Sequence, residues 1–280
     1  MNFGAVIIGD EILSGKRKDG HLARTIETLG ARGLQLSWAH YLGDDPDLIT
    51  ATFRRTFAGD DVVFSFGGIG ATPDDHTRAA AARAGGVSLK LHPDAEAEIR
   101  ARFVNDPKGV TPQRLMMGEF PEGAAIIPNP YNRIPGFSYQ RHYFLPGFPE
   151  MAWPMMVWVL DTHYAHLNAP GSIAESSIIV REAGESQLID LMNDCQKRYS
   201  GVKVFSLPKV QPERYIELGV RGVPGEVVTA IAALKQGVSQ LGFPWTDPAS
   251  IRTQYSPLRP AGTQKKTLGR GQGFFIEAGC

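Results

Sequence analysis

The chain has 280 residues, of which 29 are basic and 29 acidic, so its formal net charge is zero. This balance argues against a surface that coats a polyanion and against an acidic tail. Hydrophobic residues make up 42% and charged residues 21% of the chain, a composition that can bury a core and excludes a disordered protein.

Strand and helix patterns alternate three times in the first 90 residues. The continuous apolar segment 4–9 is typical of a strand buried on both faces of a parallel sheet. Alternation of this kind predicts βαβ units. The further elements expected here are helix 22–29, strand 34–40, helix 46–58, strand 62–66 and helix 76–84.

The pattern is less regular beyond residue 91. We expect helices near 94–103 and 112–117, short strands at 124–127 and 141–145, and a helix after Pro149. The segment 169–172, Ala-Pro-Gly-Ser, breaks both regular structures and predicts a linker. The first domain is therefore expected to cover residues 1–168.

The rest of the chain predicts a smaller α+β domain, 172–246, followed by an irregular tail, 247–280. The tail shows no hydrophobic periodicity and contains Pro248, Pro257 and Pro260. The elements of the second domain follow a βαββα order: strand 176–180, helix 187–199, strands 203–206 and 215–220, and helix 226–241.

The most informative segment is 65–77, Ser-Phe-Gly-Gly-Ile-Gly-Ala-Thr-Pro-Asp-Asp-His-Thr, between a buried strand and a helix. Gly67, Gly68 and Gly70 let the backbone approach an anion closely, and the helix that follows offers free N–H groups. The alternative is a plain turn in which Thr72 caps the helix and Asp75 closes a capping box. Capping does not require three glycines, so we favour a phosphate site.

Three acidic pairs follow predicted strands: Asp10 with Glu11, Asp44 with Asp45, and Asp74 with Asp75. The carboxyl ends of parallel strands share one edge of the sheet, so these pairs can converge on one crevice. A carboxylate beside a bound phosphate needs a cation between them, which predicts a divalent metal ion. The alternatives are a helix cap for Asp45 and a solvated loop for Glu11.

These residues resemble the molybdopterin-binding domain of molybdenum cofactor biosynthesis, and more closely the N-terminal part of the CinA (competence/damage-inducible protein A) family. The resemblance rests on segments 9–15, 43–45 and 67–77, and it extends through 120–124, 127–130, 134–137 and 145–151. It implies a three-layer α/β fold, a mostly parallel sheet with helices on both faces, followed by a KH-like α+β domain. The deamidase domain of full-length CinA proteins is expected to be absent, because too few residues follow.

The resemblance also implies a ligand and a reaction. The expected ligand is a phosphorylated pterin, such as molybdopterin, or an adenine dinucleotide, and CinA-type members are similar to a metal-dependent ADP-ribose pyrophosphatase. An adenylyltransferase acting on molybdopterin or FMN and a non-catalytic binding module are the alternatives. We expect Asp44 and Asp75 to hold Mg²⁺ or orient a water. The expected ligand-binding residues are Gly67, Gly68, Gly70, Thr72, Thr77, Asp10, Glu11, Asp45, Pro146 and Gly147.

Partners and compartment follow from charge and composition. From Ser172 to Trp245 eight basic residues balance eight acidic ones, which predicts no binding to nucleic acid. Apolar positions in this stretch suggest a homo-oligomer. The longest apolar run, 151–160, is far shorter than the roughly 20 residues that span a bilayer, so no membrane segment is expected. Two cysteines without a disulfide pattern, and no signal peptide, favour the cytoplasm.

Overall fold

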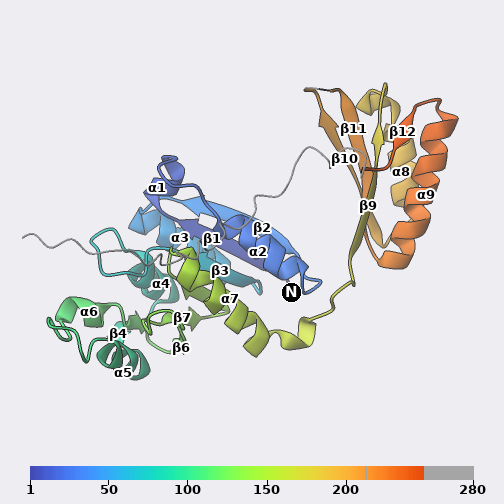
Figure 1. Ribbon diagram of the computed structural model, residues 1–280. Coiled ribbons are helices and arrows are strands. Elements are labelled where there is room, and N and C mark those ends of the chain that lie inside the picture. The colour runs from blue at the N-terminus through green and yellow to red at the C-terminus, as the bar shows by residue number, and fades with distance from the viewer. Residues whose placement is uncertain (212, 249–280) are drawn as a thin grey trace, which may run out of the picture. The chain divides into compact units, whose positions relative to one another are not determined.

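The computed structural model describes residues 1–211 and 213–248 (Figure 1). These residues form two compact units, Met1–Ile173 and a second one that begins at Ala174. The expected irregular tail lies outside the described residues from 249 onward. Each unit is considered separately below.

The first unit is built on a six-stranded sheet with the order β2-β1-β3-β8-β7-β6. The strands β2, β1, β3 and β8 run parallel, and β7 and β6 continue the sheet antiparallel. Ile7 of β1 pairs with Phe66 of β3, which pairs in turn with Leu145 of β8, so these strands end at the same edge. The strands are β1 (Phe3–Ile8), β2 (Leu36–Leu42), β3 (Val62–Phe66), β6 (Ala125–Ile127), β7 (Gly136–Tyr139) and β8 (His142–Leu145).

Helices cover both faces of this sheet. Phe64 of β3 belongs to a buried cluster with Leu29 of α2 and Met155 of α7, whereas its neighbour Val63 belongs to another cluster with Phe53 of α3. Because successive strand residues point to opposite faces, these two clusters lie on the two sides of the sheet. The predicted three-layer fold is confirmed. The helices are α1 (Asp10–Leu13), α2 (His21–Gly30), α3 (Pro46–Phe57), α4 (Thr77–Gly85), α5 (Pro93–Arg102), α6 (Pro112–Met116) and α7 (Pro149–His163).

Smaller elements complete the first unit. A two-stranded antiparallel sheet joins β4 (Leu89–Leu91) and β5 (Glu119–Pro121). A short 3₁₀ helix, η1 (Ala165–Leu167), follows α7. No helix among residues 1–211 and 213–248 combines the length and the apolar composition needed to cross a bilayer.

The second unit is an antiparallel sheet of order β10-β11-β9-β12 with two helices, which confirms the predicted α+β class. Leu218 of β11, Ile178 of β9 and Leu234 of α9 are fully buried in one core. The sequence did not predict β12, because two residues are too short to show a periodicity. The elements are β9 (Ala174–Val180), η2 (Glu185–Gln187), α8 (Ile189–Arg198), β10 (Val202–Lys209), β11 (Tyr215–Gly222), α9 (Pro224–Gln240) and β12 (Trp245–Thr246).

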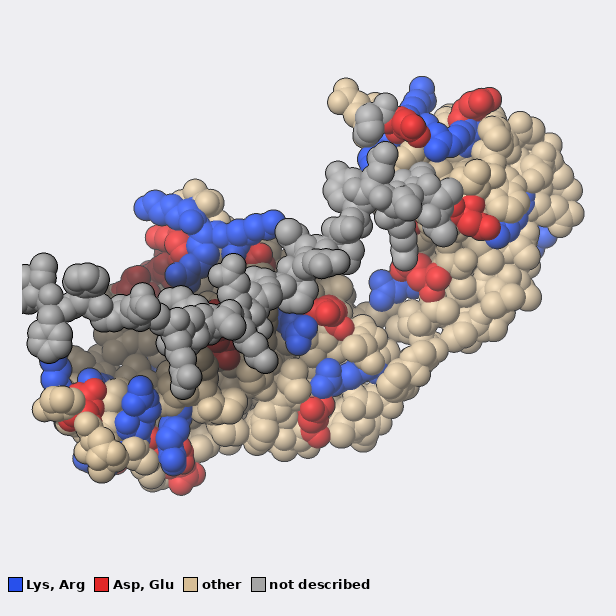
Figure 2. Space-filling view, in the orientation of Figure 1, with Lys and Arg blue, Asp and Glu red and all other residues tan. Residues whose placement is uncertain are grey.

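The surface of the second unit mixes charges of both signs. Figure 2 shows basic side chains next to acidic ones on its visible face, and Arg181 pairs with Glu213 at 2.9 Å. Lys235 pairs with Asp247 at the same distance. Since strong nucleic-acid binding requires clustered cations, the absence of tight RNA binding stays a prediction for this unit.

A buried histidine gives the first unit a testable pH dependence. His142 is fully buried; its Nδ1–H donates to the Gln140 carbonyl at 2.8 Å and its Nε2 accepts from the Thr56 hydroxyl at 2.8 Å. Burial lowers the pKa of His142 to about 4, although the bond to Gln140 opposes this shift. Below pH ~6.5 the unfolded chain therefore binds a proton at His142, whereas His142 of the folded chain stays neutral until the pH falls to about 4.

We expect His142 to lower the free energy of unfolding by about 3 kcal/mol as the pH falls from ~6.5 to ~4, because only the unfolded state is protonated in that window. Urea unfolding of the wild type and of His142→Gln at several pH values measures this. The variant should lose stability less steeply than the wild type. Parallel stability profiles for the two proteins would contradict the assignment.

Candidate functional site

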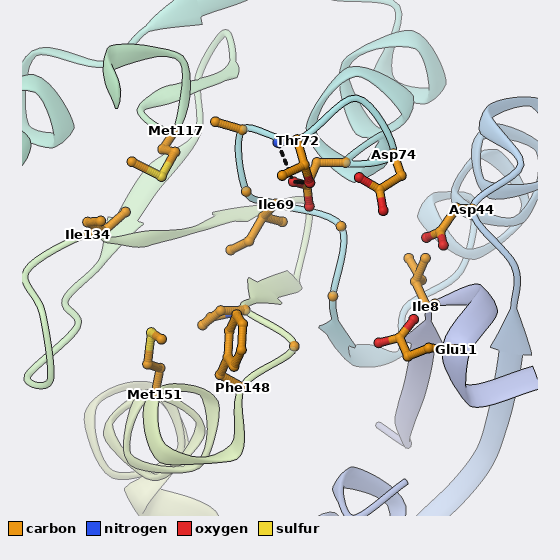
Figure 3. Close-up of a pocket in the computed structure, with 18 of the residues that line it drawn as sticks. Ile8, Glu11, Asp44, Ile69, Thr72, Asp74, Met117, Ile134, Phe148 and Met151 are labelled. Carbon is orange, nitrogen blue, oxygen red and sulfur yellow. Dashed lines mark hydrogen bonds between the residues drawn. The ribbon is translucent and has the colours of Figure 1, made fainter. Parts of the chain in front are cut away.

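A pocket of about 390 Å³ opens at the carboxyl edge of the parallel strands. Its walls come from the segments that follow β1, β2, β3 and β8, together with loop 129–135. The glycine-rich segment 67–72, referred to here as the glycine loop, runs along it (Figure 3). The strand register therefore brings together segments that are as much as 138 residues apart, from Gly9 to Gly147.

The three glycines of the glycine loop are required by the packing of the fold. Gly67 has φ 101°, and a Cβ there would lie 2.3 Å from the Ile8 carbonyl oxygen. Gly68 has φ 68°, and its Cβ would lie 2.3 Å from the Thr77 hydroxyl. At Gly70 a Cβ would lie 2.5 Å from the Asp75 carboxylate. The glycines thus have a structural role in addition to any role in binding.

The backbone N–H groups of the loop divide into used and unused donors. The Gly67 N–H donates to the Leu145 carbonyl at 3.0 Å, so this N–H is not free for a ligand, although Gly67 was among the expected ligand-binding residues. The Thr72 N–H donates to Asp75 at 2.8 Å. In the described parts of the chain, the N–H groups of residues 68–71 have no hydrogen-bond acceptor. These successive N–H groups are therefore free to donate hydrogen bonds to an anion.

Residues 72–75 form a closed turn before α4. The Thr72 N–H and hydroxyl both donate to Asp75 Oδ2, at 2.8 and 2.5 Å, and the Asp75 N–H donates to the Thr72 carbonyl at 3.0 Å. Helix α4 begins only at Thr77, with His76 at its N-cap. The alternative in which Thr72 caps this helix is therefore wrong, because Thr72 pairs with Asp75 inside the turn.

The carboxylates of Asp44, Asp74 and Glu11 lie on one side of the pocket (Figure 3). Asp44 Oδ2 accepts from the Asp10 N–H at 2.9 Å, and Asp10 Oδ1 accepts from the Asp44 N–H at 3.2 Å, which links the ends of β1 and β2. Burial raises the pKa of Asp44, opposed by the bond from the Asp10 N–H and reinforced by the neighbouring carboxylates. Such a site favours a bound cation.

Three of the expected ligand-binding residues do not line the pocket. Asp10 accepts from the Asp44 backbone instead. Asp45 is exposed and caps α3, accepting from the N–H groups of Asp47 and Leu48 at 2.8 and 2.9 Å, as the alternative reading held. Thr77 is buried, and its hydroxyl donates to the Gly67 carbonyl at 3.0 Å. In each case the polar group already makes a hydrogen bond with another group of the protein.

The opposite side of the pocket is apolar, and sequence reasoning missed it. Figure 3 shows Met117, Ile134, Phe148 and Met151 there, while the expected Pro146 and Gly147 lie in the same wall. These side chains come from three separate places in the chain, Met117, Ile134 and the start of α7, so no periodic pattern marks them. Asp74 was likewise not among the residues expected to bind the ligand.

Two arginines near the pocket were also missed. Arg17 lines the pocket; its guanidinium is 3.6 Å from Glu11 Oε1 and 5.7 Å from the centre of the Phe148 ring. Arg78 is buried, and its guanidinium donates to the Gly70 carbonyl at 2.6 Å and to the Met116 carbonyl. Burial lowers the pKa of Arg78. Arg78 therefore connects the glycine loop to the end of α6.

The carboxylates do not form a closed metal cage. Among residues 1–211 and 213–248 there is no group of three or more His, Cys, Asp or Glu side chains placed to hold one ion. Mg²⁺ commonly binds through one or two carboxylates together with substrate phosphates and water. Asp44 and a second pocket carboxylate fit that mode of binding, in which the ligand supplies the remaining oxygens.

A mostly parallel sheet with a glycine loop, free amides and carboxylates at its carboxyl edge is typical of α/β domains that bind small anionic ligands. The family described as probable molybdopterin binding domain matches residues 4–166, and the chain belongs to that family. This confirms the predicted family resemblance. The matched residues make up most of the first unit, Met1–Ile173.

Several known proteins are similar to this chain. A protein of Caldivirga maquilingensis is 30% identical over 251 residues, 86% of this chain and 95% of its own length. A CinA-like protein of Desulfosudis oleivorans is 37% identical over 146 residues, 51% of this chain, so the chain spans about a third, 35%, of that relative. The crystal structure of the protein CinA with unknown function from Thermoplasma acidophilum is 30% identical, with a TM-score of 0.52, covering 57% of this chain and 98% of that one.

Proposed function

We propose that the pocket binds a phosphorylated ligand with an aromatic ring, a pterin phosphate or an adenine dinucleotide, and that with Mg²⁺ or a similar ion it cleaves the phosphoanhydride of an ADP-ribose-type substrate. The observation that supports this is the division of one pocket into two sides. The carboxylates of Glu11, Asp44 and Asp74 lie on one side and the side chains of Met117, Ile134, Phe148 and Met151 on the other, and the glycine loop with its free amides runs along the pocket. A ligand with a charged phosphate part and a flat ring matches both sides.

The charge of the pocket supports the requirement for a cation. In the part of the chain that the structure describes, its lining contains four carboxylates, Glu11, Asp44, Asp74 and Asp75, against one guanidinium, that of Arg17. A phosphate group brought beside these carboxylates is repelled unless a positive ion lies between them. Arg17 balances one carboxylate at most, so a divalent ion is needed.

Each group of this chain has a distinct part in the proposed reaction. The bound ion supplies Lewis acidity at the phosphate oxygens. Asp44 and Asp75 would hold the ion, or the Asp75 oxygen that accepts nothing from Thr72 would orient a water toward phosphorus. Attack of that water breaks the phosphoanhydride and gives AMP and ribose 5-phosphate. The free N–H groups of Gly68 and Gly70 bind phosphate oxygens, while the apolar side excludes water from the ring.

Two alternatives make different demands on the same pocket. An adenylyltransferase must hold ATP and a second substrate, molybdopterin or FMN, and it releases pyrophosphate. A non-catalytic module binds its ligand at a one-to-one ratio without turnover. Carboxylates that bind an ion beside the phosphates serve all three functions, so the products formed distinguish them.

We expect the purified protein to release AMP from ADP-ribose when Mg²⁺ is present and to stop when EDTA is added. Chromatography of a panel of dinucleotides with and without the ion measures this. Pyrophosphate release from ATP with molybdopterin or FMN would identify the adenylyltransferase instead. Stoichiometric binding without any product would identify the module.

A further inference from the structure

A buried histidine, His21, contacts two segments beside the pocket without lining it. Its side chain is 5% exposed, and its ring stacks on Phe66 with the ring centres 4.5 Å apart. Phe66 directly precedes the glycine loop. His21 Nε2 lies 3.2 Å from the carbonyl oxygen of Gly147, which lines the pocket. One ring thus contacts the residue before the glycine loop and the turn at Gly147.

The partners of His21 determine which ring nitrogen carries the proton. Trp153 Nε1 can only donate, so His21 Nδ1 accepts its hydrogen bond at 3.3 Å. The Gly147 carbonyl can only accept, so His21 Nε2 carries the proton and donates. The neutral ring satisfies both partners. A second proton at Nδ1 would face the Trp153 N–H, and that hydrogen bond would be lost.

The charged groups around His21 act in opposite directions. Burial lowers the pKa of His21 most, Arg17 lowers it further, and the bond to Gly147 and the nearby Asp19 oppose this. Asp19 accepts from the His21 N–H at 2.8 Å, and Arg24 lies over the Trp153 ring at 5.6 Å. Phe66, Trp153 and Gly147 add no titratable side chain.

The turn that His21 holds is linked to the glycine loop. The Gly67 N–H donates to the Leu145 carbonyl, two residues before Gly147, at 3.0 Å. A Cβ added at Gly147 would lie within van der Waals contact of Gly67 Cα, at 3.4 Å, so little space separates the two segments. A displacement of residues 146–148 therefore changes the width of the pocket at the loop. His21 does not line the pocket and acts only through these backbone groups.

We propose that His21 is a positioning residue: its Nε2–H holds the Gly147 carbonyl and with it the turn 146–148 against the glycine loop, and loss of this donor releases the turn and weakens ligand binding. The inference rests on the proposed function for the identity of the ligand. The positioning of the turn itself does not depend on a ligand.

Hydrogen exchange tests the positioning without any ligand. At pH 7.5, His21→Ala should speed the exchange of peptides covering residues 145–152 by about tenfold, the effect of losing one hydrogen bond. His21→Gln retains a donor and should stay near the wild type. Equal protection in wild type and His21→Ala overturns the proposal. Should His21→Ala fail to fold, His21→Phe, which keeps a ring against Phe66 but has no donor, should show the same faster exchange.

Binding of ADP-ribose with Mg²⁺, measured by calorimetry at pH 7.5, tests the consequence for the ligand. His21→Ala should bind roughly tenfold more weakly than the wild type, and His21→Gln, which keeps a donor, should bind nearly as the wild type does. His76→Gln, a control for the half-buried ring near Asp74, should behave as the wild type. Equal affinity in the wild type and His21→Ala overturns the inference. Absence of wild-type binding at pH 7.5 refutes the proposed function alone, and hydrogen exchange then decides about His21.

Discussion

Asp44→Asn should reduce Mg²⁺-dependent release of AMP from ADP-ribose by at least about 100-fold, because it removes a charge that holds the ion. The asparagine carbonyl can still accept from the Asp10 N–H, so the ends of β1 and β2 stay linked. Loss of the charge also relieves its repulsion with Asp10, Glu11 and Asp74. The free energy of unfolding should therefore be equal to that of the wild type or slightly higher. Steady-state kinetics and urea unfolding measure the two effects.

The adjacent Asp45→Asn is a matched control for this variant. It removes the same charge one residue further along, yet Asp45 is exposed, caps α3 and does not line the pocket. Asparagine caps helices about as well as aspartate, so stability should change by less than about 1 kcal/mol. Activity should stay within a few-fold of the wild type. Equal losses in the two variants would show a general effect of charge and exclude Asp44 as an ion ligand.

Gly67→Ala should destabilise the first unit by about 3 kcal/mol or more, since the added methyl would lie 2.3 Å from the Ile8 carbonyl oxygen at a positive φ. Relief requires β1 and β3 to separate at the pocket edge, so ligand binding should be lost together with stability. Urea unfolding followed by tryptophan fluorescence reports on this unit through Trp38, Trp153 and Trp158.

Gly123→Ala separates backbone strain from the steric clash. Gly123 also has a positive φ, 87°, but nothing lies within 4 Å of an added Cβ. Its alanine variant should lose only about 1 kcal/mol, the cost of the conformation. If Gly67→Ala were no more destabilising than this variant, the close contact between the glycine loop and β1 would be disproved.

Local patterns in the sequence were sufficient to predict the fold class. The continuous apolar strand 4–9 and the alternating helices that follow predicted a parallel sheet covered on both sides. Asp45 before Pro46 marks the start of α3, which is where the structure begins that helix. Such features depend on neighbours within a few residues, and those neighbours are visible in the sequence.

The sequence also marked part of the candidate site. Gly68 and Gly70 were predicted from the glycine-rich segment between a buried strand and a helix. Asp44 was predicted from the rule that the carboxyl ends of parallel strands share an edge, and all three residues line the pocket. This rule predicts which strand ends meet. It does not predict which polar group at each end is already satisfied by the protein.

Tertiary structure decided which polar groups at the strand ends are already hydrogen-bonded within the protein. The N–H of Gly67, the hydroxyl of Thr77 and the carboxylate of Asp10 all have protein partners that the strand register and the turns bring to them. The apolar side of the pocket and the bond from His21 to Gly147, 126 residues away, also arise only from the packing of distant segments. The sequence by itself determined the kind of fold and the edge where the site lies. Long-range packing decided which groups at that edge remain free to bind, because a hydrogen bond made within the protein removes a donor or acceptor from the ligand.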